Sequence, residues 1–131
     1  MRAVLHMLRK QAKGKLIVVF SCGGNRDVQK RSKMGMVAST YADYIILTTD
    51  NPRSESPQRI NEQIRFGFSA QQSYVEQMDR QQAIEQALEM ATEGDTIAIL
   101  GKGHEITQTI GNEVSYFSDL ACVEQFLLNK K

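Results

Sequence analysis

The chain has 131 residues, of which 41% are hydrophobic and 24% are charged. This length and balance fit one globular domain with a substantial core, and they exclude a disordered or fibrous protein. No apolar run reaches the roughly 18 to 20 residues that a bilayer span needs, and the basic start is not typical of a signal peptide, so we expect a soluble protein. The two cysteines, Cys22 and Cys122, and the two histidines, His6 and His104, lack metal-type or redox-type spacing. Neither a metal site nor a disulfide scaffold is predicted.

Positive charge is concentrated near the start of the chain. The net charge is +1, yet residues 1–33 carry nine Lys or Arg and one acid, Asp27. Such asymmetry indicates an anion partner at one end, or simply a basic helix surface in solvent. Both interpretations stay open for the bases at helix-type positions: Arg2, Arg9, Lys10, Lys13 and Lys15. The bases beside a glycine pair are better anion-binding candidates: Arg26, Lys30, Arg31 and Lys33.

The first part of the chain alternates between helical and strand periodicity. Short apolar runs rich in β-branched residues are typical of strands covered on both faces of a parallel sheet. The expected elements are a helix carrying Val4, Leu5 and Leu8 that ends at Gly14, a strand over 16–20, a helix carrying Met34, Val37, Ala38 and Tyr41, and a strand over 44–47.

The alternation continues after a turn-rich segment, 50–57, whose final proline suits the first turn of a helix. The expected elements are a helix carrying Ile60, Ile64 and Phe68, a short strand over 74–77, a helix carrying Ala83, Ile84, Ala87, Leu88 and Ala91 that stops at 93–95, a strand over 96–100, a hairpin of 107–110 and 114–117 around Gly111-Asn112, and a helix capped by Ser118 with Val123, Phe126 and Leu127 inward.

This alternation predicts a single α/β domain over residues 1–131, with an open, mostly parallel sheet and helices on both faces. In such sheets the loops after the carboxyl ends of the strands form the ligand crevice. The three loops expected there are Ser21–Asp27, Asp50–Pro57 and Gly101–Glu105. The sequence therefore predicts one site built from three separate segments.

Each of these loops has a chemical interpretation and a purely structural one. Glycines beside Arg26 would let a backbone approach a ligand while the guanidinium binds a carboxylate or phosphate, but a tight turn with a surface arginine fits equally. Asp50–Arg53 suits an amino-acid headgroup, or a helix-entry turn. Gly101–Glu105 is not a Walker A loop, and no G-x-G-x-x-G occurs. His104 alone is more often structural than catalytic.

Taken together and in order, the motifs resemble the Mur ligase family. The motifs are Ser-Cys-Gly-Gly-Asn-Arg-Asp (21–27), Lys-Arg (30–31), Met-Gly (34–35), Thr-Asp-Asn-Pro-Arg (49–53), Asp-Arg (79–80), Gly-Lys-Gly-His-Glu (101–105) and Phe-Ser-Asp (117–119). Their order is similar to that in the C-terminal domain of the diaminopimelate-adding members (MurE), with its Rossmann-like fold. The resemblance implies that the N-terminal UDP-substrate domain and the central ATP-binding domain lie outside this chain.

The resemblance also implies site residues. It assigns meso-diaminopimelate to Arg26, Asp50, Asn51, Pro52, Arg53, Gly101 and Glu105, and phosphate contacts to Lys30, Arg31 and Lys102. It implies no catalytic group and no metal ligand in this chain. Meso-diaminopimelate is lysine with a second, distal carboxylate, so Arg53 would select it, whereas lysine-adding relatives have a small residue there.

The implied function is amino-acid recognition in an ATP-dependent ligase of peptidoglycan synthesis in the bacterial cytoplasm. ATP and Mg²⁺, bound mainly by the central domain, would convert the carboxylate of the UDP-MurNAc-L-Ala-D-Glu dipeptide into an acyl phosphate, which the amine attacks. The expected partners are these small molecules and the other domains, with no nucleic acid or membrane, and the isolated chain should be inactive. Two alternatives stay open: a stand-alone amino-acid or nucleotide binding module, and the same domain of a lysine-adding, cyanophycin or folylpolyglutamate synthetase.

Overall fold

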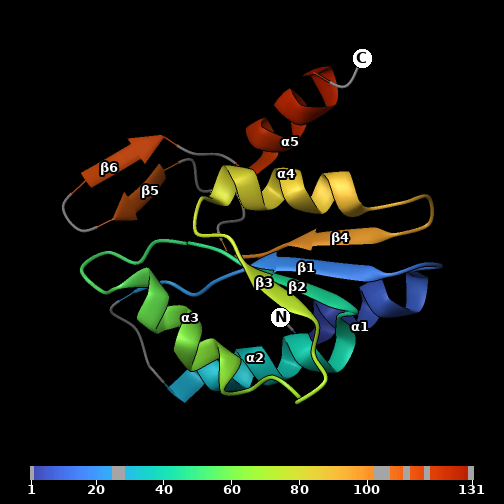
Figure 1. Ribbon diagram of the computed structural model, residues 1–131, viewed down its shortest axis with the longest axis horizontal. Helices are drawn as coiled ribbons and strands as arrows, with labels where there is room; N and C mark the ends of the chain where they lie inside the picture. Colours follow the sequence, from blue (N-terminus) through green and yellow to red (C-terminus); the bar gives the residue numbers. More distant parts are fainter. Residues whose placement is uncertain (1, 25–28, 102–106, 111–112, 117–118, 130–131) are drawn as a thin grey trace.

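The structure is a computed structural model that describes residues 2–24, 29–101, 107–110, 113–116 and 119–129. Helices and strands alternate along most of the chain (Figure 1). The elements are α1 (Arg2–Gln11), β1 (Leu16–Phe20), α2 (Gln29–Tyr41), β2 (Tyr44–Leu47), α3 (Pro57–Arg65), β3 (Tyr74–Glu76), α4 (Arg80–Met90), β4 (Thr96–Ile99), β5 (Thr107–Ile110), β6 (Glu113–Tyr116) and α5 (Asp119–Asn129). No helix in these ranges is both long and apolar enough to cross a bilayer.

Four strands form one parallel sheet in the order β3-β2-β1-β4. Val18 of the central strand β1 pairs with Ile45 of β2 on one side and with Ala98 of β4 on the other. Every residue of β1 is buried, as expected for a strand with a neighbour on each edge and helices on each face. β5 and β6 form a separate antiparallel pair. The predicted open, mostly parallel sheet is confirmed.

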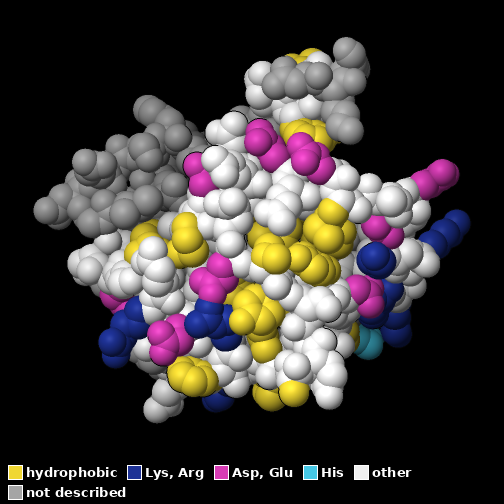
Figure 2. Space-filling model, viewed as in Figure 1, with side chains coloured by type: hydrophobic (Ala, Val, Ile, Leu, Met, Phe, Trp, Pro, Cys, Tyr) yellow, Lys and Arg dark blue, Asp and Glu magenta, His cyan; other side chains and the backbone are white. Residues whose placement is uncertain are grey.

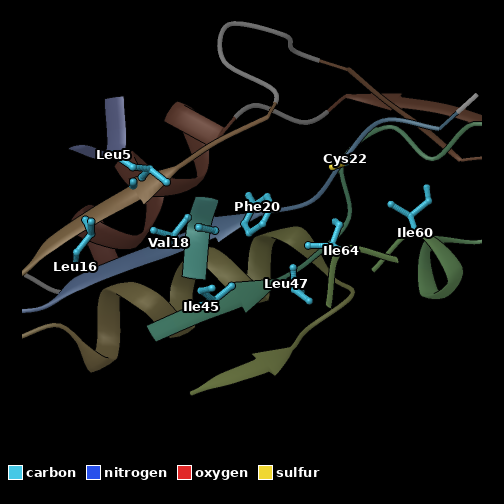
Figure 3. Close-up of a cluster of buried hydrophobic side chains, with 11 residues drawn as sticks. Leu5, Leu16, Val18, Phe20, Cys22, Ile45, Leu47, Ile60 and Ile64 are labelled. Atoms are coloured by element: carbon cyan, nitrogen blue, oxygen red, sulfur yellow. The ribbon is translucent and has the colours of Figure 1, made fainter. Parts of the chain in front are cut away.

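Helices cover both faces of the sheet. On one face, alternate residues of β1 and β2 pack with Leu5 of α1, Ala38 of α2, and Ile60 and Ile64 of α3 (Figure 3). On the other face, Ile17, Val19 and Ile46 pack with Ala83, Ile84 and Ala87 of α4. The alternation of side chains along each strand thus divides one apolar segment between two cores. Figure 1 shows α1, α2 and α3 on one side of the sheet and α4 and α5 on the other.

Three side chains differ from the sequence prediction. Phe68 lies beyond the end of α3, whose C-cap is Phe66, although it still packs against the core. Val4 is 43% exposed, because only Leu5 of the first helical turn is buried. Leu127 is 53% exposed, whereas Val123 packs against the core of α4. The end of α5 points away from α4 in Figure 1, so its last turns have less to pack against.

The edge strand β3 has only three residues, and two of them are exposed. Its last residue, Glu76, forms an ion pair with Arg65 at the end of α3. A charged residue on a short edge strand discourages pairing with another chain.

The amino-terminal edge of the sheet is held by Asp43. Its carboxylate accepts hydrogen bonds from the Leu16 backbone N–H, at 2.8 Å, and from the Arg9 guanidinium. Partial burial works to raise the pKa of Asp43, but these hydrogen bonds and the charges of Arg9 and Lys15 outweigh it and hold the pKa below its usual value. Ionised Asp43 therefore stabilises the fold.

We predict that Asp43→Asn lowers the free energy of unfolding at pH 7. Because the pKa is lower in the folded than in the unfolded state, the contribution is complete above the unfolded pKa, about 4, and disappears as the pH falls through the folded value. Urea unfolding of wild type and variant between pH 7 and pH 2.5 should therefore show a difference that shrinks with acid. The exposed Glu62→Gln serves as control, and a difference independent of pH would contradict the prediction.

Candidate functional site

A cleft of about 460 Å³ lies at the carboxyl ends of the strands. Its volume is in the range typical of small-molecule sites. Its lining comes from the loops after β1, β2 and β4 and from the start of α2: Ser21, Cys22, Gly23, Lys30, Arg31, Met34, Asp50, Asn51, Arg53 and Gly101. In Figure 1 the arrowheads of β1 and β4 point to the side where these loops lie. The predicted convergence of three loops is confirmed for their described residues.

The loops after β1 and β2 are in direct backbone contact. Gly24 donates its N–H to the Asn51 carbonyl oxygen at 2.7 Å. A Cβ on Gly24 would overlap the Pro52 carbonyl oxygen, so only glycine fits at this contact. This contact brings the first loop against the segment that carries Asp50 and Arg53.

Arg53 has an unusual backbone and contributes a cation to the cleft. Its φ of 54° lies in the left-handed region, which is uncommon for a residue with a side chain. Its Nη1 donates to the carbonyl oxygens of Gly24, at 3.3 Å, and Asn51, at 3.2 Å. Within the described ranges no carboxylate forms an ion pair with this guanidinium. Its charge is held in place by backbone acceptors and is suited to an anionic ligand.

Asp50 brings a carboxylate to the same cleft, beside the loop after β4. Asp50 is 8% exposed. A Cβ built on Gly101, whose φ is 113°, would lie 3.0 Å from Asp50 Oδ2 and 3.6 Å from the Ser21 carbonyl oxygen. Gly101 is therefore the point at which the third loop meets the other two. With Asp50 and Arg53, the cleft presents both signs of charge, as a zwitterionic ligand requires.

Two of the three basic residues of α2, Lys30 and Arg31, were expected on the phosphate side, and they differ in exposure. Lys30 lines the cleft and is exposed. Arg31 is 1% exposed, and its terminal nitrogens donate to Glu55, Gln63 and the Gly23 carbonyl oxygen. Both terminal nitrogens of Arg31 therefore already have protein acceptors. Arg26, Lys102 and Glu105, the other cations and the acid expected at the site, lie outside the described residues.

Two buried polar residues that hold the strand ends together were not predicted. Asn61 of α3 accepts a hydrogen bond from Ser21 Oγ at 2.9 Å and donates to the Thr48 carbonyl oxygen at 2.9 Å. Arg80 of α4 donates to the carbonyl oxygens of Thr49, at 3.0 Å, and Leu100, at 3.2 Å. Asn61 lies beside Ile60 and three residues before Ile64, on the buried stripe of α3. This position in the helical period is the sequence feature that could have predicted its burial. Nothing in the sequence marks Arg80 as buried.

The described residues contain no group of three or more His, Cys, Asp or Glu that could hold a metal ion. Cys22, at the wall of the cleft, is buried beside Met34, with its Sγ 3.5 Å from the methionine sulfur. On the face in Figure 2, Lys and Arg side chains lie among Asp and Glu rather than in one continuous basic area. The carboxylate of Asp50 and the guanidinium of Arg53 in one cleft are suited to binding and orienting a small charged molecule.

Comparison with known proteins identifies the family. The family model described as "Mur ligase, glutamate ligase domain" matches residues 1–103. Because this match covers most of the chain, the chain belongs to the Mur ligase family.

Individual proteins similar to this chain agree with this family match. The chain is 51% identical, over 95% of its length, to a UDP-N-acetylmuramoyl-L-alanyl-D-glutamate--2,6-diaminopimelate ligase of Aquifex aeolicus (strain VF5), and 48% identical, over 88% of its length, to the ligase of that name in Coxiella burnetii (strain RSA 493 / Nine Mile phase I). A solved structure of a ligase with this name superposes with a TM-score of 0.92 at 36% identity, over 98% of the chain. The chain spans about a quarter of the length of each: 26%, 24% and 27%.

We predict that Gly101→Ala both destabilises the fold and displaces Asp50, whereas Gly94→Ala only destabilises it. Both glycines have positive φ, 113° and 91°, so alanine should cost about 1 kcal/mol or more at either position. A Cβ on Gly94 has only ordinary contacts, the nearest at 3.8 Å. Urea unfolding measures the first effect, and the amide chemical shifts of Asp50, Asn51 and Arg53 measure the second. Shifts that move equally in both variants would refute the contact.

Proposed function

We propose that this Mur ligase domain binds meso-diaminopimelate and presents its amine to an acyl phosphate in an ATP-dependent ligase. The reaction would add the diamino acid to UDP-N-acetylmuramoyl-L-alanyl-D-glutamate in peptidoglycan synthesis. The names of the similar ligases support this substrate. A ligase that consumes ATP and a nucleotide-linked precursor would work in the bacterial cytoplasm.

The observation that carries the proposal is the Arg53 guanidinium, which lacks a carboxylate partner among the described residues and lies in one cleft with Asp50. Meso-diaminopimelate has a carboxylate and an ammonium group at each end. Arg53 would bind the distal carboxylate, and Asp50 would accept hydrogen bonds from an ammonium group. Arg26 and Glu105, which the family resemblance assigns to the same ligand, would complete this charge pattern.

The charge of Arg53 also explains how lysine would be rejected. Lysine has no distal carboxylate, so its binding would leave the arginine in the cleft without an anion. Sites that are built to bind a polar group discriminate strongly against analogues that lack it, because their own groups stay unpaired.

ATP and Mg²⁺ would be bound mainly by the central domain of the ligase. The proposed contribution of this domain is to orient the amine, which lowers the barrier without a general base in the cleft. Lys30 and Lys102 are the cations proposed on the phosphate side. Arg31 is not proposed there, because it is buried and its terminal nitrogens already have protein acceptors. The N-terminal and central domains of the ligase would bind the UDP-linked dipeptide and ATP, so we expect this 131-residue domain to give no turnover by itself.

We predict that Arg53→Ala in the full-length ligase raises the KM for meso-diaminopimelate roughly 10- to 100-fold, the loss expected when a charge-assisted hydrogen bond is removed. The KM for ATP should change less than about twofold, since Arg53 would not contact the nucleotide. Steady-state kinetics with each substrate varied in turn provide the measurement. Arg59→Ala, an exposed arginine on α3, is the matched control. An unchanged KM for meso-diaminopimelate would refute the role of Arg53.

We also predict a difference between ligands at equilibrium. Calorimetry of the wild-type ligase should show much tighter binding of meso-diaminopimelate than of lysine, and Arg53→Ala should remove most of this difference. Equal affinity for both ligands in the wild type would contradict the assignment of the distal carboxylate. It would favour a lysine-adding relative or a general amino-acid binding module.

A further inference from the structure

We propose that the ion pair between buried Arg31 and partly exposed Glu55 is a positioning device that holds Arg53 in its ligand-binding geometry. This inference rests on the proposed function, because it concerns the loop that would select meso-diaminopimelate. Neither residue needs to touch the ligand. Their role would be to fix the loop after β2 against α2, α3 and the loop after β1.

The hydrogen bonds of Arg31 connect three separate segments. Its Nη1 donates to Glu55 Oε2 at 3.0 Å and to Gln63 Oε1, on α3, at 2.7 Å. Its Nη2 donates to Glu55 Oε1 at 2.9 Å and to the Gly23 carbonyl oxygen, in the loop after β1, at 3.2 Å. The pairing with Glu55 is bidentate, and this fixes direction as well as distance.

Glu55 is well placed to control Arg53. It lies two residues after Arg53, and its backbone N–H donates to the Pro52 carbonyl oxygen at 3.0 Å, closing a turn around Arg53. Within that turn Arg53 has the left-handed φ of 54°. A strained conformation persists only where the surroundings impose it. The turn is fixed at one end by the contact between Gly24 and Asn51, and at the other by Glu55 bound to Arg31.

Stability alone is a poor explanation for this pair. The side chain of Arg31 is 2% exposed and that of Glu55 is 26% exposed, so the cation is removed from water almost completely. Its Nε is buried with no hydrogen-bond partner within the described chain. The cost of removing this cation from water, with its Nε donor unsatisfied, offsets much of its electrostatic attraction to Glu55. Well-packed apolar residues often stabilise a fold as well as such an ion pair does. The planar Arg31 guanidinium, with hydrogen-bond acceptors in three segments, is better suited to orienting these segments than to stabilising the fold.

The test uses Glu55→Gln, Arg31→Lys and the double variant in the full-length ligase. Glu55→Gln removes the charge but keeps the size, and Arg31→Lys keeps the charge but loses the fork. Each single variant should raise the KM for meso-diaminopimelate about tenfold or more and leave the KM for ATP within about twofold, because misplacing a binding group by about 1 Å is costly. The double variant should raise the KM for meso-diaminopimelate no further than the more impaired of the two single variants does, since the two residues act as a unit.

Hydrogen exchange of the ligand-free protein gives a readout that does not depend on turnover. Backbone amides of residues 50–56 other than Pro52, above all the hydrogen-bonded amide of Glu55, should exchange about tenfold faster in Glu55→Gln than in wild type, while amides of β1 stay protected. Asp43→Asn is the matched control, since it breaks an ion pair with Arg9 at the opposite edge of the sheet. It should alter neither the KM for meso-diaminopimelate nor exchange in residues 50–56. If the Arg31 variant does not fold, Glu55→Gln and Glu55→Asp, at a partly exposed position, still decide the question.

The outcomes separate this inference from the proposed function. A wild-type ligase that does not use meso-diaminopimelate refutes the proposed function, and exchange in residues 50–56 still tests the ion pair. A wild-type ligase that uses it, with unchanged KM and unchanged exchange in Glu55→Gln, refutes the positioning role alone. Equal increases in the KM values for ATP and meso-diaminopimelate would indicate general destabilisation and would also refute it.

Discussion

The cleft depends on the hydrogen bond from Gly24 N–H to the Asn51 carbonyl oxygen. It joins two loops that follow neighbouring parallel strands, and it requires a residue without a side chain at position 24. The parallel sheet brings the ends of β1, β2 and β4 to one edge, but a sheet alone leaves the loops free to diverge. The close approach of the two backbones also positions Arg53 in the cleft, because the Asn51 carbonyl oxygen accepts hydrogen bonds from both Gly24 N–H and Arg53 Nη1.

Buried polar side chains surround this contact and reinforce it. Asn61 joins the ends of β1 and β2 from one face of the sheet, and Arg80 joins the ends of β2 and β4 from the other. Arg31 adds a third connection through the helix layer. Each side chain supplies hydrogen bonds to backbone groups that have left the strand ladder, and a buried backbone group without a partner would be costly. The polar interior of this domain is concentrated where the ligand would bind, whereas the strands themselves pack through apolar residues.

The sequence predicted the sheet well because buried parallel strands are short, apolar and β-branched. The predicted bounds of β1 and β2 agree with the structure residue for residue. The three loops were predictable for the same reason, since topology places strand ends together. Orientation within the loops was not. A buried Arg31 has the same sequence pattern as a solvent-exposed one, and no local pattern indicates the left-handed backbone of Arg53 or its contact with Gly24, which is distant in sequence. Leu127 fits the helical period of Val123, yet the period alone does not show where α5 leaves the surface.

The left-handed backbone of Arg53 sets stability against specificity at one position. An L-residue with a side chain loses about 1 to 2 kcal/mol in this conformation, and glycine does not. Selection for a sturdier fold alone would favour glycine at position 53, and with it the loss of a cation from the cleft. Under the role proposed for Arg53, drift towards a less selective domain would be downhill in folding free energy, and an arginine would be retained at this position only while the ligase has to bind a ligand with a distal carboxylate.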